Sequence, residues 1–315
     1  MNIVLPVLAV VGGIGILAFA GDLLVRHAAA IAVRHHVPKA VVGAVILGFG
    51  TSLPEFFVSF AAALEGTTEI ALSNVIGSNI ANVGLILGVG GLLRALPVPR
   101  NVVRLDLPIG LLSTIFLLMW VQGAAPITRT AGFILLGGFL CYLWLTLRRT
   151  RTYRLNVDRE VVEEPESRTI FWIVTGLVGL AGGAQVLVWG GVEIATAFNV
   201  SPRVIGLSLI AFGTSLPELA AMIAAARKGE IELAVGNIAG SNLFNLLFVL
   251  GATATFIEIP TTAVVVQRDI PIMGAFGVLA FPFLARDPWR LDRRQAGILL
   301  VAFVAYVVWM WGTRA

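Results

Sequence analysis

The sequence predicts an all-α integral membrane protein in which ten transmembrane helices form two inverted five-helix repeats. Three observations lead to this fold. First, 58% of the 315 residues are hydrophobic and 13% are charged, whereas about a quarter of the residues in soluble proteins are charged. Second, the high mean hydropathy of +0.93 comes from ten apolar segments of membrane-spanning length. Third, a stretch of the first half recurs in the second half. The composition excludes a soluble enzyme, and we find no pattern typical of nucleic-acid binding.

The first half contains five apolar segments bounded by proline, glycine or charged residues. A helix needs about 20 apolar residues to cross a bilayer. The first segment has no basic leader region before it, so we expect it to be a span and not a cleaved signal peptide. Pro38, Gly66 and Pro97 mark the following breaks. The predicted spans of this half cover residues 3–24, 38–64, 69–93, 105–122 and 128–147.

The second half has the same organisation and follows a polar stretch. Residues 151–167 are too few and too polar for a domain, so we expect a solvated linker between a first repeat at 1–150 and a second at 168–315. Charged and glycine residues around Lys228, and Pro288, mark breaks in the second repeat. Its predicted spans cover residues 168–197, 203–226, 231–257, 269–285 and 295–312.

The distribution of basic residues predicts the orientation in the membrane. Eighteen of the 22 lysines and arginines fall on one side when alternate loops are assigned to alternate sides. Basic residues favour the cytoplasmic side, so the linker is expected inside a cell membrane (plasma or inner) and both termini outside. Five spans is an odd number, so the second half enters the bilayer in the opposite orientation. Inverted repeats with a site at their midplane interface are typical of secondary transporters.

The internal repeat preserves polar residues. Residues 41–88 align without gaps to residues 204–251 at a constant offset of 163, and nearly half of the positions are identical. The motif cores are 43–88 and 206–251. A repeat kept only for packing would preserve apolar positions. This one preserves hydroxyls, amides and carboxylates, which supply the oxygen ligands that hard cations prefer.

Two glutamates lie at equivalent positions near the middle of apolar spans. A lone charge there costs at least about 2.5 kcal/mol. The neighbouring spans contain no basic residue that could pair with Glu55 or Glu218, so the remaining partners are a bound cation or a proton. The structural alternative is a protonated glutamate that is hydrogen-bonded between helices. The recurrence in both halves favours the cation.

Proline and glycine next to the glutamates predict irregular backbone. Pro54 and Pro217 lack an amide donor and clash with the carbonyls four residues back, at Gly50 and Gly213. A carbonyl released in this way must find a partner inside the membrane, and a cation is one possible partner. A simple kink is the structural alternative, since such kinks are common in membrane helices.

Hydroxyl and amide side chains accompany both glutamates. Alone, one polar stripe would be typical of an ordinary helix interface, but two equivalent stripes favour a four-helix cage of oxygen atoms. Such a cage suits Ca²⁺, which takes six to eight oxygens, and also Na⁺. It contains no Cys or His, so soft transition metals are not expected. The stripe of Asn74, Ser78 and Asn82 is repeated as Asn237, Ser241 and Asn245. The hydroxyls on the glutamate helices are Thr51 and Ser52, repeated as Thr214 and Ser215.

Two copies of G-T-S-x-P-E, each followed by G-S-N, resemble the alpha repeats of the cation/Ca²⁺ exchanger superfamily. The similarity covers nearly the whole chain and is greatest to prokaryotic sodium/calcium exchangers with ten spans. It implies a core of the second, third, seventh and eighth spans, across which the first and sixth spans slide. By position, the implied ligands are Glu55, Glu218, Thr51, Thr214, Ser52, Ser215, Ser78, Ser241, Asn82, Asn245 and the carbonyls of Gly48 and Ala211.

Asn245 departs from the pattern of some superfamily members. Relatives with aspartate at this position include K⁺-dependent exchangers, so the resemblance implies that this chain does not co-transport K⁺. Because Asn82 is also neutral, the cage holds two formal negative charges. One Ca²⁺ neutralises them, and three Na⁺ would leave a charge of +1.

The sequence therefore predicts a secondary antiporter and not an enzyme, which exchanges Na⁺ for Ca²⁺ by alternating access at a single midplane cage without a cofactor. Exchange of Ca²⁺ for H⁺ is an open alternative, because the glutamates could carry protons. A passive channel would not need a counter-ion. An intramembrane hydrolase based on Ser52 or Ser215 is disfavoured, since neither serine has a His or Lys base nearby. The oligomeric state is not predicted.

A second pair of acidic residues also recurs at the offset of 163. Asp106 and Asp269 are each followed by an apolar residue and a proline. Aspartate before a proline is typical of the start of a helix. We therefore expect these residues to cap their helices and not to bind the transported ion.

Overall fold

The structure, a computed structural model, describes residues 3–152, 164–198, 211–284 and 289–312. Within these ranges the chain is helical apart from two short strands and the connecting turns. Eight helical segments of the described residues are long and apolar enough to cross a membrane. The other two predicted spans, 203–226 and 269–285, lie partly outside the described residues, as does most of the predicted linker.

The first half contains an interrupted second span. In chain order its elements are α1 (Val4–Arg34), α2 (Lys39–Val42), α3 (Gly48–Thr51), α4 (Leu53–Leu64), α5 (Thr68–Ala81), α6 (Leu87–Leu93), β1 (Leu96–Pro97), α7 (Leu107–Trp120) and α8 (Arg129–Thr152). Wider π-helical turns join α2 to α3 over Gly43–Leu47, join α5 to α6 over Asn82–Ile86, and precede α7 over Val102–Asp106. A short helical turn at Gln122–Ala124 leads to α8.

The second half repeats this arrangement. Its described elements are α9 (Glu166–Ala197), α11 (Ala211–Gly213), α12 (Leu216–Lys228), α13 (Ile231–Leu243), α14 (Leu250–Phe256), α15 (Ile270–Leu284), β2 (Arg290–Leu291) and α16 (Arg293–Gly312). Here π-helical turns cover Phe244–Val249 and Val265–Asp269.

The helix boundaries of the two halves match at the offset found in the sequence. α6 and α14 begin and end 163 residues apart, and so do the π-helical turns that precede α7 and α15. α9 begins within one residue of the position expected from α1 and ends at that position. The structural repeat thus extends well beyond the motif that the sequence comparison detects.

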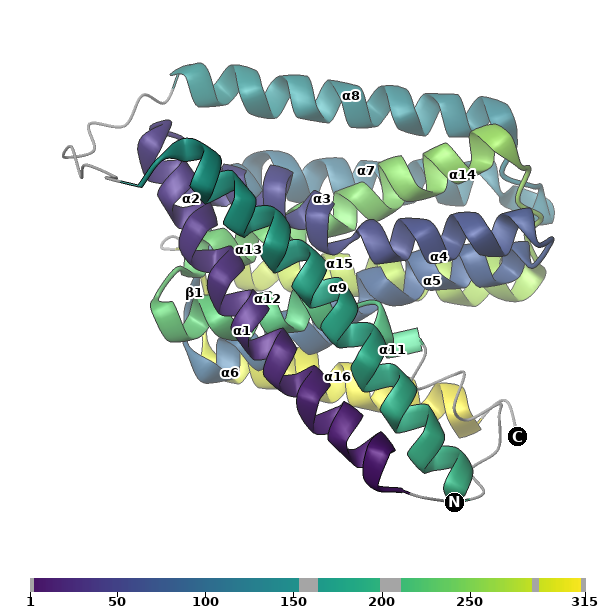
Figure 1. Ribbon diagram of the computed structural model, residues 1–315. Coiled ribbons are helices and arrows are strands. Elements are labelled where there is room, and N and C mark those ends of the chain that lie inside the picture. The colour runs from purple at the N-terminus through teal and green to yellow at the C-terminus, as the bar shows by residue number, and fades with distance from the viewer. Residues whose placement is uncertain (1–2, 153–163, 199–210, 285–288, 313–315) are drawn as a thin grey trace.

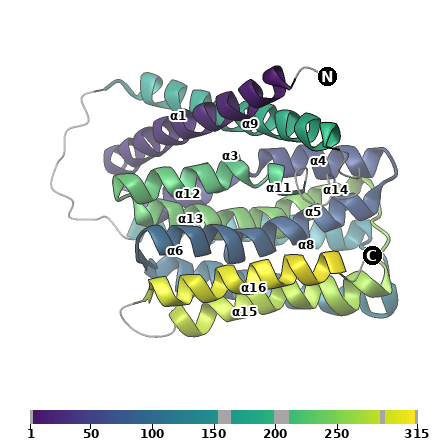
Figure 2. The ribbon, with the colours of Figure 1, turned by 90° about the horizontal axis from the view of Figure 1, so that it is seen from below.

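Two long helices form a layer of their own. α1 and α9 lie side by side and cross the other helices obliquely (Figure 1). Seen from below, they cover one face of the bundle that the other helices form (Figure 2). α1 contacts α12 in the bundle, and α9 contacts α3. The layer therefore rests on the helices that carry the glutamate motifs.

The bundle is built from contacts between the halves. α8 packs on α14, the equivalent α16 packs on α6, and α7 packs on α15. The segment from α2 to α3 lies directly against α13, with the two backbones in contact. A Cβ atom on Gly43 would overlap the Leu233 carbonyl, and one on Gly240 would overlap the Ala44 carbonyl. Only glycine permits this approach, which brings the polar motif of one half against that of the other.

Two short β contacts also connect the halves. Leu96 pairs with Leu291 and Pro97 with Arg290 in an antiparallel ribbon. Separately, Ile127 and Ile259 exchange two backbone hydrogen bonds of 2.9 and 3.0 Å. Residues 96 and 259 are themselves equivalent at the offset of 163, so the two contacts are counterparts of each other.

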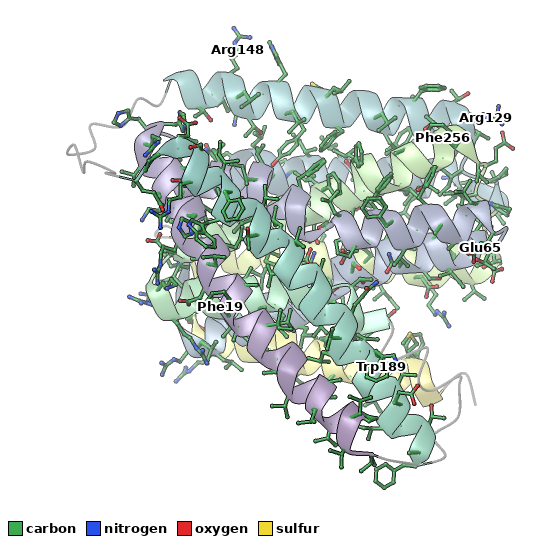
Figure 3. The ribbon with its side chains drawn as sticks, viewed as in Figure 1. Phe19, Glu65, Arg129, Arg148, Trp189 and Phe256 are labelled. Atoms are coloured by element: carbon green, nitrogen blue, oxygen red, sulfur yellow. The ribbon has the colours of Figure 1, made fainter. Side chains whose placement is uncertain are left out.

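The outer surface is apolar along the helices and charged at their ends. Phe19 on α1 and Trp189 on α9 are 69% and 46% exposed, as expected for side chains that face lipid. Figure 3 shows Glu65, Arg129 and Arg148 near helix ends. This distribution agrees with a multi-pass membrane protein.

Two predictions about individual elements are wrong. The sequence predicted that the first span ends at residue 24, whereas α1 continues to Arg34 because Val25, Ala28 and Ile31 are buried against the rest of the molecule. The predicted capping role of Asp106 is also wrong. Its side chain makes no capping hydrogen bond to α7. The carboxyl is buried and instead faces Tyr142 on α8.

Candidate cation site

The two G-T-S-x-P-E motifs break their helices at the same residue. Ser52 separates α3 from α4 and has φ −90° and ψ 7°, and Ser215 separates α11 from α12 with φ −89° and ψ 2°. In both copies the proline occupies the first turn of the new helix, where its missing amide donor has no intrahelical role. The predicted irregular backbone is present in both halves.

The break places each glutamate in the first turn of a helix. Glu55 lies in the first turn of α4, and Glu218 lies in the first turn of α12. The unpaired amide groups and the dipole of a helix N-terminus favour negative charge. Both helices are long enough for this effect to operate. The sequence predicted irregular backbone at the prolines, but not that a new helix begins just before each glutamate.

Both carboxyl groups are fully enclosed. Glu55 is 1% exposed and Glu218 is 0% exposed. The two groups lie near enough to each other to repel. The ion pairs found among the described residues all lie elsewhere in the molecule.

Hydroxyl groups of both halves surround the carboxyls. Ser52 Oγ, from the first half, donates a hydrogen bond of 2.9 Å to Glu218 Oε1 in the second half. Conversely, the hydroxyl of Thr214, from the second half, lies against Glu55. The hydroxyl of Ser78 also lies against Glu55, and those of Thr51 and Ser241 lie against Glu218. The structure thus brings five of the six predicted hydroxyl residues next to the two carboxyl groups, and Ser215 is the exception.

Several oxygen atoms in this region are buried without a hydrogen-bond donor. They belong to three kinds of side-chain group, each present once in each half: a carboxylate, a serine hydroxyl and an asparagine amide. They are Glu55 Oε2, Glu218 Oε2, Ser78 Oγ, Ser215 Oγ, Asn82 Oδ1 and Asn245 Oδ1. A buried acceptor without a donor is unfavourable, and six oxygens match the lower coordination number of Ca²⁺. These residues fit the chemistry of a hard cation.

The two predicted backbone ligands differ in what surrounds them. The Gly48 carbonyl accepts hydrogen bonds from the Ser52 amide and from Ser241 Oγ, both at 3.3 Å. It therefore lies beside the other half of the predicted cage. Ala211 is the first residue of α11, next to residues outside the described ranges.

The donor set is unlike that of transition-metal sites. Among the described residues there is no cluster of three or more His, Cys, Asp and Glu side chains. Two carboxylates among neutral oxygens suit Na⁺ or Ca²⁺ better than zinc or copper, which favour imidazole and thiolate ligands.

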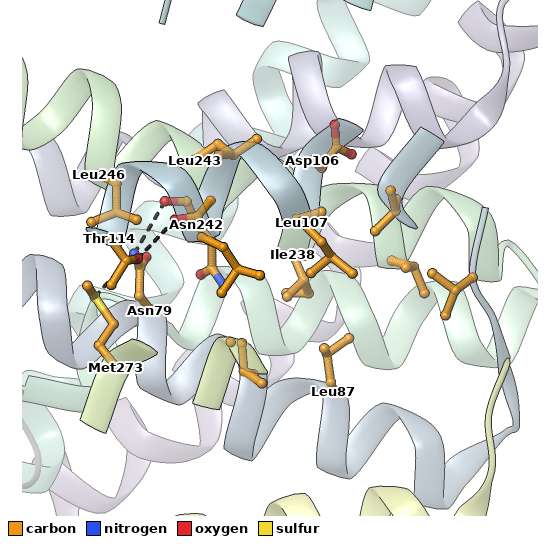
Figure 4. Close-up of a pocket in the computed structure, with 18 of the residues that line it drawn as sticks. Asn79, Leu87, Asp106, Leu107, Thr114, Ile238, Asn242, Leu243, Leu246 and Met273 are labelled. Carbon is orange, nitrogen blue, oxygen red and sulfur yellow. Dashed lines mark hydrogen bonds between the residues drawn. The ribbon is translucent and has the colours of Figure 1, made fainter. Parts of the chain in front are cut away.

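The sequence analysis missed two asparagines. Asn79 and Asn242 occupy equivalent positions, and each is the last residue of a G-S-N motif. Asn82 Nδ2 donates a hydrogen bond of 2.9 Å to Asn242 Oδ1, and Asn245 Nδ2 donates one of 3.2 Å to Asn79 Oδ1. Figure 4 shows Asn79 and Asn242 side by side at the edge of an apolar pocket. The sequence did contain a signal for them, because asparagine occupies this position in both copies of the repeat.

Comparison with known proteins identifies the family of this chain. The family model described as sodium/calcium exchanger protein matches residues 5–148 and 168–312. The chain is 34% identical to the putative antiporter CaxA of Alkalimonas amylolytica, over 93% of this chain and 95% of that protein. It is 33% identical to the inner membrane protein YrbG of Escherichia coli, over 95% of this chain and 93% of that protein.

A solved structure shares the fold. The sodium-calcium exchanger NCX_Mj, in crystals soaked with Na⁺ and Sr²⁺, superposes with a TM-score of 0.85 at 28% identity. The superposition covers 97% of this chain and 98% of that one. The family match covers nearly all of both halves and leaves out only the linker and the chain ends. This chain belongs to the sodium/calcium exchanger family.

Proposed function

We propose that this protein is a secondary antiporter that exchanges Na⁺ for Ca²⁺ across the cell membrane. The observation that carries the proposal is the pair of enclosed glutamates, which have no basic partner among the described residues and are surrounded by oxygen atoms from both halves. Inside a bilayer such a pair needs compensating positive charge. A bound cation supplies it, and membership of the sodium/calcium exchanger family supports Ca²⁺ and Na⁺ as the cations.

The cation cage in this proposal consists of the twelve residues implied by the family resemblance. Glu55 and Glu218 bind Ca²⁺ between them, and the hydroxyl and amide oxygens complete the coordination. Na⁺ ions occupy overlapping positions, so the two cations compete. The six donor-free oxygens support this set. No cofactor takes part, and the chain performs no covalent chemistry on its cargo.

Charge explains why exchange is obligatory. The empty cage carries two formal negative charges in a region of low dielectric constant, and moving it across the membrane in this state would be unfavourable. One Ca²⁺ or at least two Na⁺ neutralise the cage. Each change of access therefore occurs with a cation bound, and net leakage of one ion is suppressed.

Alternating access follows from the two-layer architecture. We propose ten spans in two inverted halves, with the linker in the cytosol and both termini outside. The layer of α1 and α9 slides across the bundle and opens the cage to one side at a time. The separate position of this layer in Figure 2 supports the proposal, as does its pattern of contacts, because α1 and α9 pack mainly against each other.

The proposal is tested with purified protein in liposomes. Vesicles loaded with Na⁺ and diluted into Na⁺-free buffer should accumulate ⁴⁵Ca²⁺, and vesicles loaded with choline should not. The double variant Glu55→Gln/Glu218→Gln is the transport-dead control. If ⁴⁵Ca²⁺ uptake is independent of the Na⁺ gradient but depends on an imposed pH gradient, the counter-ion is H⁺ and not Na⁺. Uptake that needs no counter-ion would refute antiport.

A further inference from the structure

Four asparagines lie immediately behind the proposed cage. They form two equivalent pairs at the offset of 163, and we call them the asparagine set: Asn74, Asn79, Asn237 and Asn242. None of them belongs to the proposed ligands. Asn79 is 4% exposed and Asn237 is 0% exposed, so this part of the set is enclosed in the bundle.

Each member of the set accepts a hydrogen bond from one proposed ligand. The Asn79 and Asn242 amide oxygens accept from Asn245 Nδ2 at 3.2 Å and from Asn82 Nδ2 at 2.9 Å. The Asn237 and Asn74 amide oxygens accept in the same way from the threonine hydroxyls. Thr214 Oγ1 lies 3.4 Å from Asn74 Oδ1. Thr51 Oγ1 lies 3.3 Å from Asn237 Oδ1 and 3.0 Å from the Leu47 carbonyl, so its one hydrogen atom is shared between an acceptor of each half.

All four hydrogen bonds cross between the halves. Thr51 and Asn82 belong to the first half, and their acceptors belong to the second. The other two bonds have the reverse direction. No ligand of this group is therefore oriented only by its own half.

The direction of these hydrogen bonds matters for a cation. A hydroxyl or an amide can present either a lone pair or a hydrogen atom, and a hydrogen atom that points at a cation repels it. The asparagine set takes up the hydrogen atoms of the ligands. The remaining amide oxygens, Asn82 Oδ1 and Asn245 Oδ1, are buried without a donor, which leaves their lone pairs available.

The orientation of Asn79 and Asn74 is itself determined by further contacts, whereas Asn237 Nδ2 is buried without an acceptor. Asn79 Nδ2 donates to the Asn242 carbonyl at 3.3 Å and approaches Met273 Sδ at 3.7 Å. Asn74 Nδ2 donates to the Glu55 carbonyl at 3.2 Å and to Ser59 Oγ at 3.0 Å. A flipped Asn79 or Asn74 amide would lose these bonds and would place an NH₂ group against a donor of the ligand. The amide oxygen must therefore face the ligand.

We propose that the asparagine set consists of positioning residues, which hold the hydrogen atoms of Thr51, Thr214, Asn82 and Asn245 away from the bound cation. The set thereby makes the neutral ligands act as acceptors only. This inference rests on the proposed function, because it assigns a role relative to the cation that the cage binds.

Equilibrium Ca²⁺ binding by purified protein tests the proposal. Asn79→Ala should weaken Ca²⁺ binding by about 10–100-fold, the usual effect of removing a residue that orients a metal ligand. Asn79 is proposed to act through Asn245, so the two effects must be coupled. In an Asn245→Ala background, Asn79→Ala should change Ca²⁺ binding by less than about twofold. Additive effects would overturn the proposal, because a merely structural asparagine does not act through Asn245.

A control distinguishes positioning from packing. Thr114 lines the same pocket as Asn79 (Figure 4) and is buried. Among the described residues, its hydroxyl donates only to the Gly110 carbonyl of its own helix, at 2.9 Å. Thr114→Val removes a buried hydroxyl from this environment without touching a proposed ligand, and Ca²⁺ binding should stay within about twofold of wild type. An equal loss in Thr114→Val and Asn79→Ala would overturn the proposal.

The equivalent pair gives an independent measurement. Asn242→Ala and Asn82→Ala, singly and together, should show the same non-additivity. If neither Asn79→Ala nor Asn242→Ala yields folded protein by size-exclusion chromatography, the set is structural and the proposal fails. A wild-type protein that binds no Ca²⁺ would instead refute the proposed function.

Discussion

Replacing Glu218 by glutamine should separate the two consequences of burying this carboxylate. Glutamine is nearly isosteric, and its amide oxygen can still accept the 2.9 Å hydrogen bond from Ser52. The other atom changes from Oε2, a buried acceptor without a donor, to an NH₂ group. The substitution therefore removes one of two formal charges and reverses one hydrogen-bonding direction at the cage.

The expected loss of Ca²⁺ affinity is large. Removing one partner from a buried ion pair costs about 3–5 kcal/mol, which corresponds to a decrease in affinity of about 10²–10⁴-fold. In the cation-free protein, by contrast, the substitution should increase the stability of the fold. An uncompensated charge at the membrane centre costs at least about 2.5 kcal/mol, and the neutral amide of the Glu218→Gln variant would not carry that charge. At alkaline pH in EDTA, Glu218→Gln should therefore be more stable to heat than wild type.

Thermal unfolding of the purified protein in detergent, followed by tryptophan fluorescence, measures both effects. A ligand at 100 times its dissociation constant stabilises the folded state by about 2.7 kcal/mol, so Ca²⁺ should raise the wild-type midpoint and leave that of the variant unchanged. Glu193→Gln, a change in a partly exposed glutamate of α9, is the matched control and should respond to Ca²⁺ like wild type. Our reasoning is refuted if Glu218→Gln keeps the wild-type Ca²⁺ response, or if it is the less stable protein in EDTA.

Three further substitutions test other parts of the structure. Asn245→Asp adds a titratable group to the cage and removes the donor to Asn79, so ⁴⁵Ca²⁺ uptake should acquire a new pH dependence; an unchanged pH profile would place residue 245 outside the cage. Lys228→Met breaks the 2.6 Å ion pair between α12 and Asp22 of α1. This partly exposed pair contributes at most about 1 kcal/mol, so the maximal exchange rate should change by up to about fivefold. The KM for Ca²⁺ should stay constant, and a changed KM would contradict a role confined to the contact between α1 and α12. Gly240→Val would overlap the Ala44 carbonyl and should eliminate the monodisperse peak in size-exclusion chromatography, whereas Gly137→Val on the exposed side of α8 should retain it.

Much of the fold could be predicted from the sequence, because apolar segments and breaks are local signals. α9 ends where the apolar pattern ends, at Ala197. The end of α1 could not be predicted in this way. Its last turns contain charged residues such as Arg26, and only the burial of Ala28 and Ile31 against the other helices shows that the helix continues. The π-helical turns were missed for the same reason, since packing between the halves determines them and the local sequence gives no sign.

The candidate site was accessible from the sequence because of the repeat. Glu55 and Glu218 could be related to each other by identity and spacing alone, and both are buried in the structure. Asn79 was overlooked because a spacing of four residues selects a single helix face, and Asn79 lies outside the stripe of Asn74, Ser78 and Asn82. Its partner is on another helix of the other half. Such a contact depends on tertiary structure, and the residue pattern of a single helix does not predict it.

The β contacts between the halves restrict how the molecule can move. Leu96 and Leu291 are joined in one ribbon, and Ile127 and Ile259 are joined in a separate bridge. Spreading the bundle apart would break these backbone hydrogen bonds and expose the four buried apolar side chains at the two contacts. We therefore expect the remaining helices to behave as a single rigid body, with all large displacement confined to the α1–α9 pair. A cross-link between α1 and α9 should be tolerated during transport, and one between α1 and α12 should stop it.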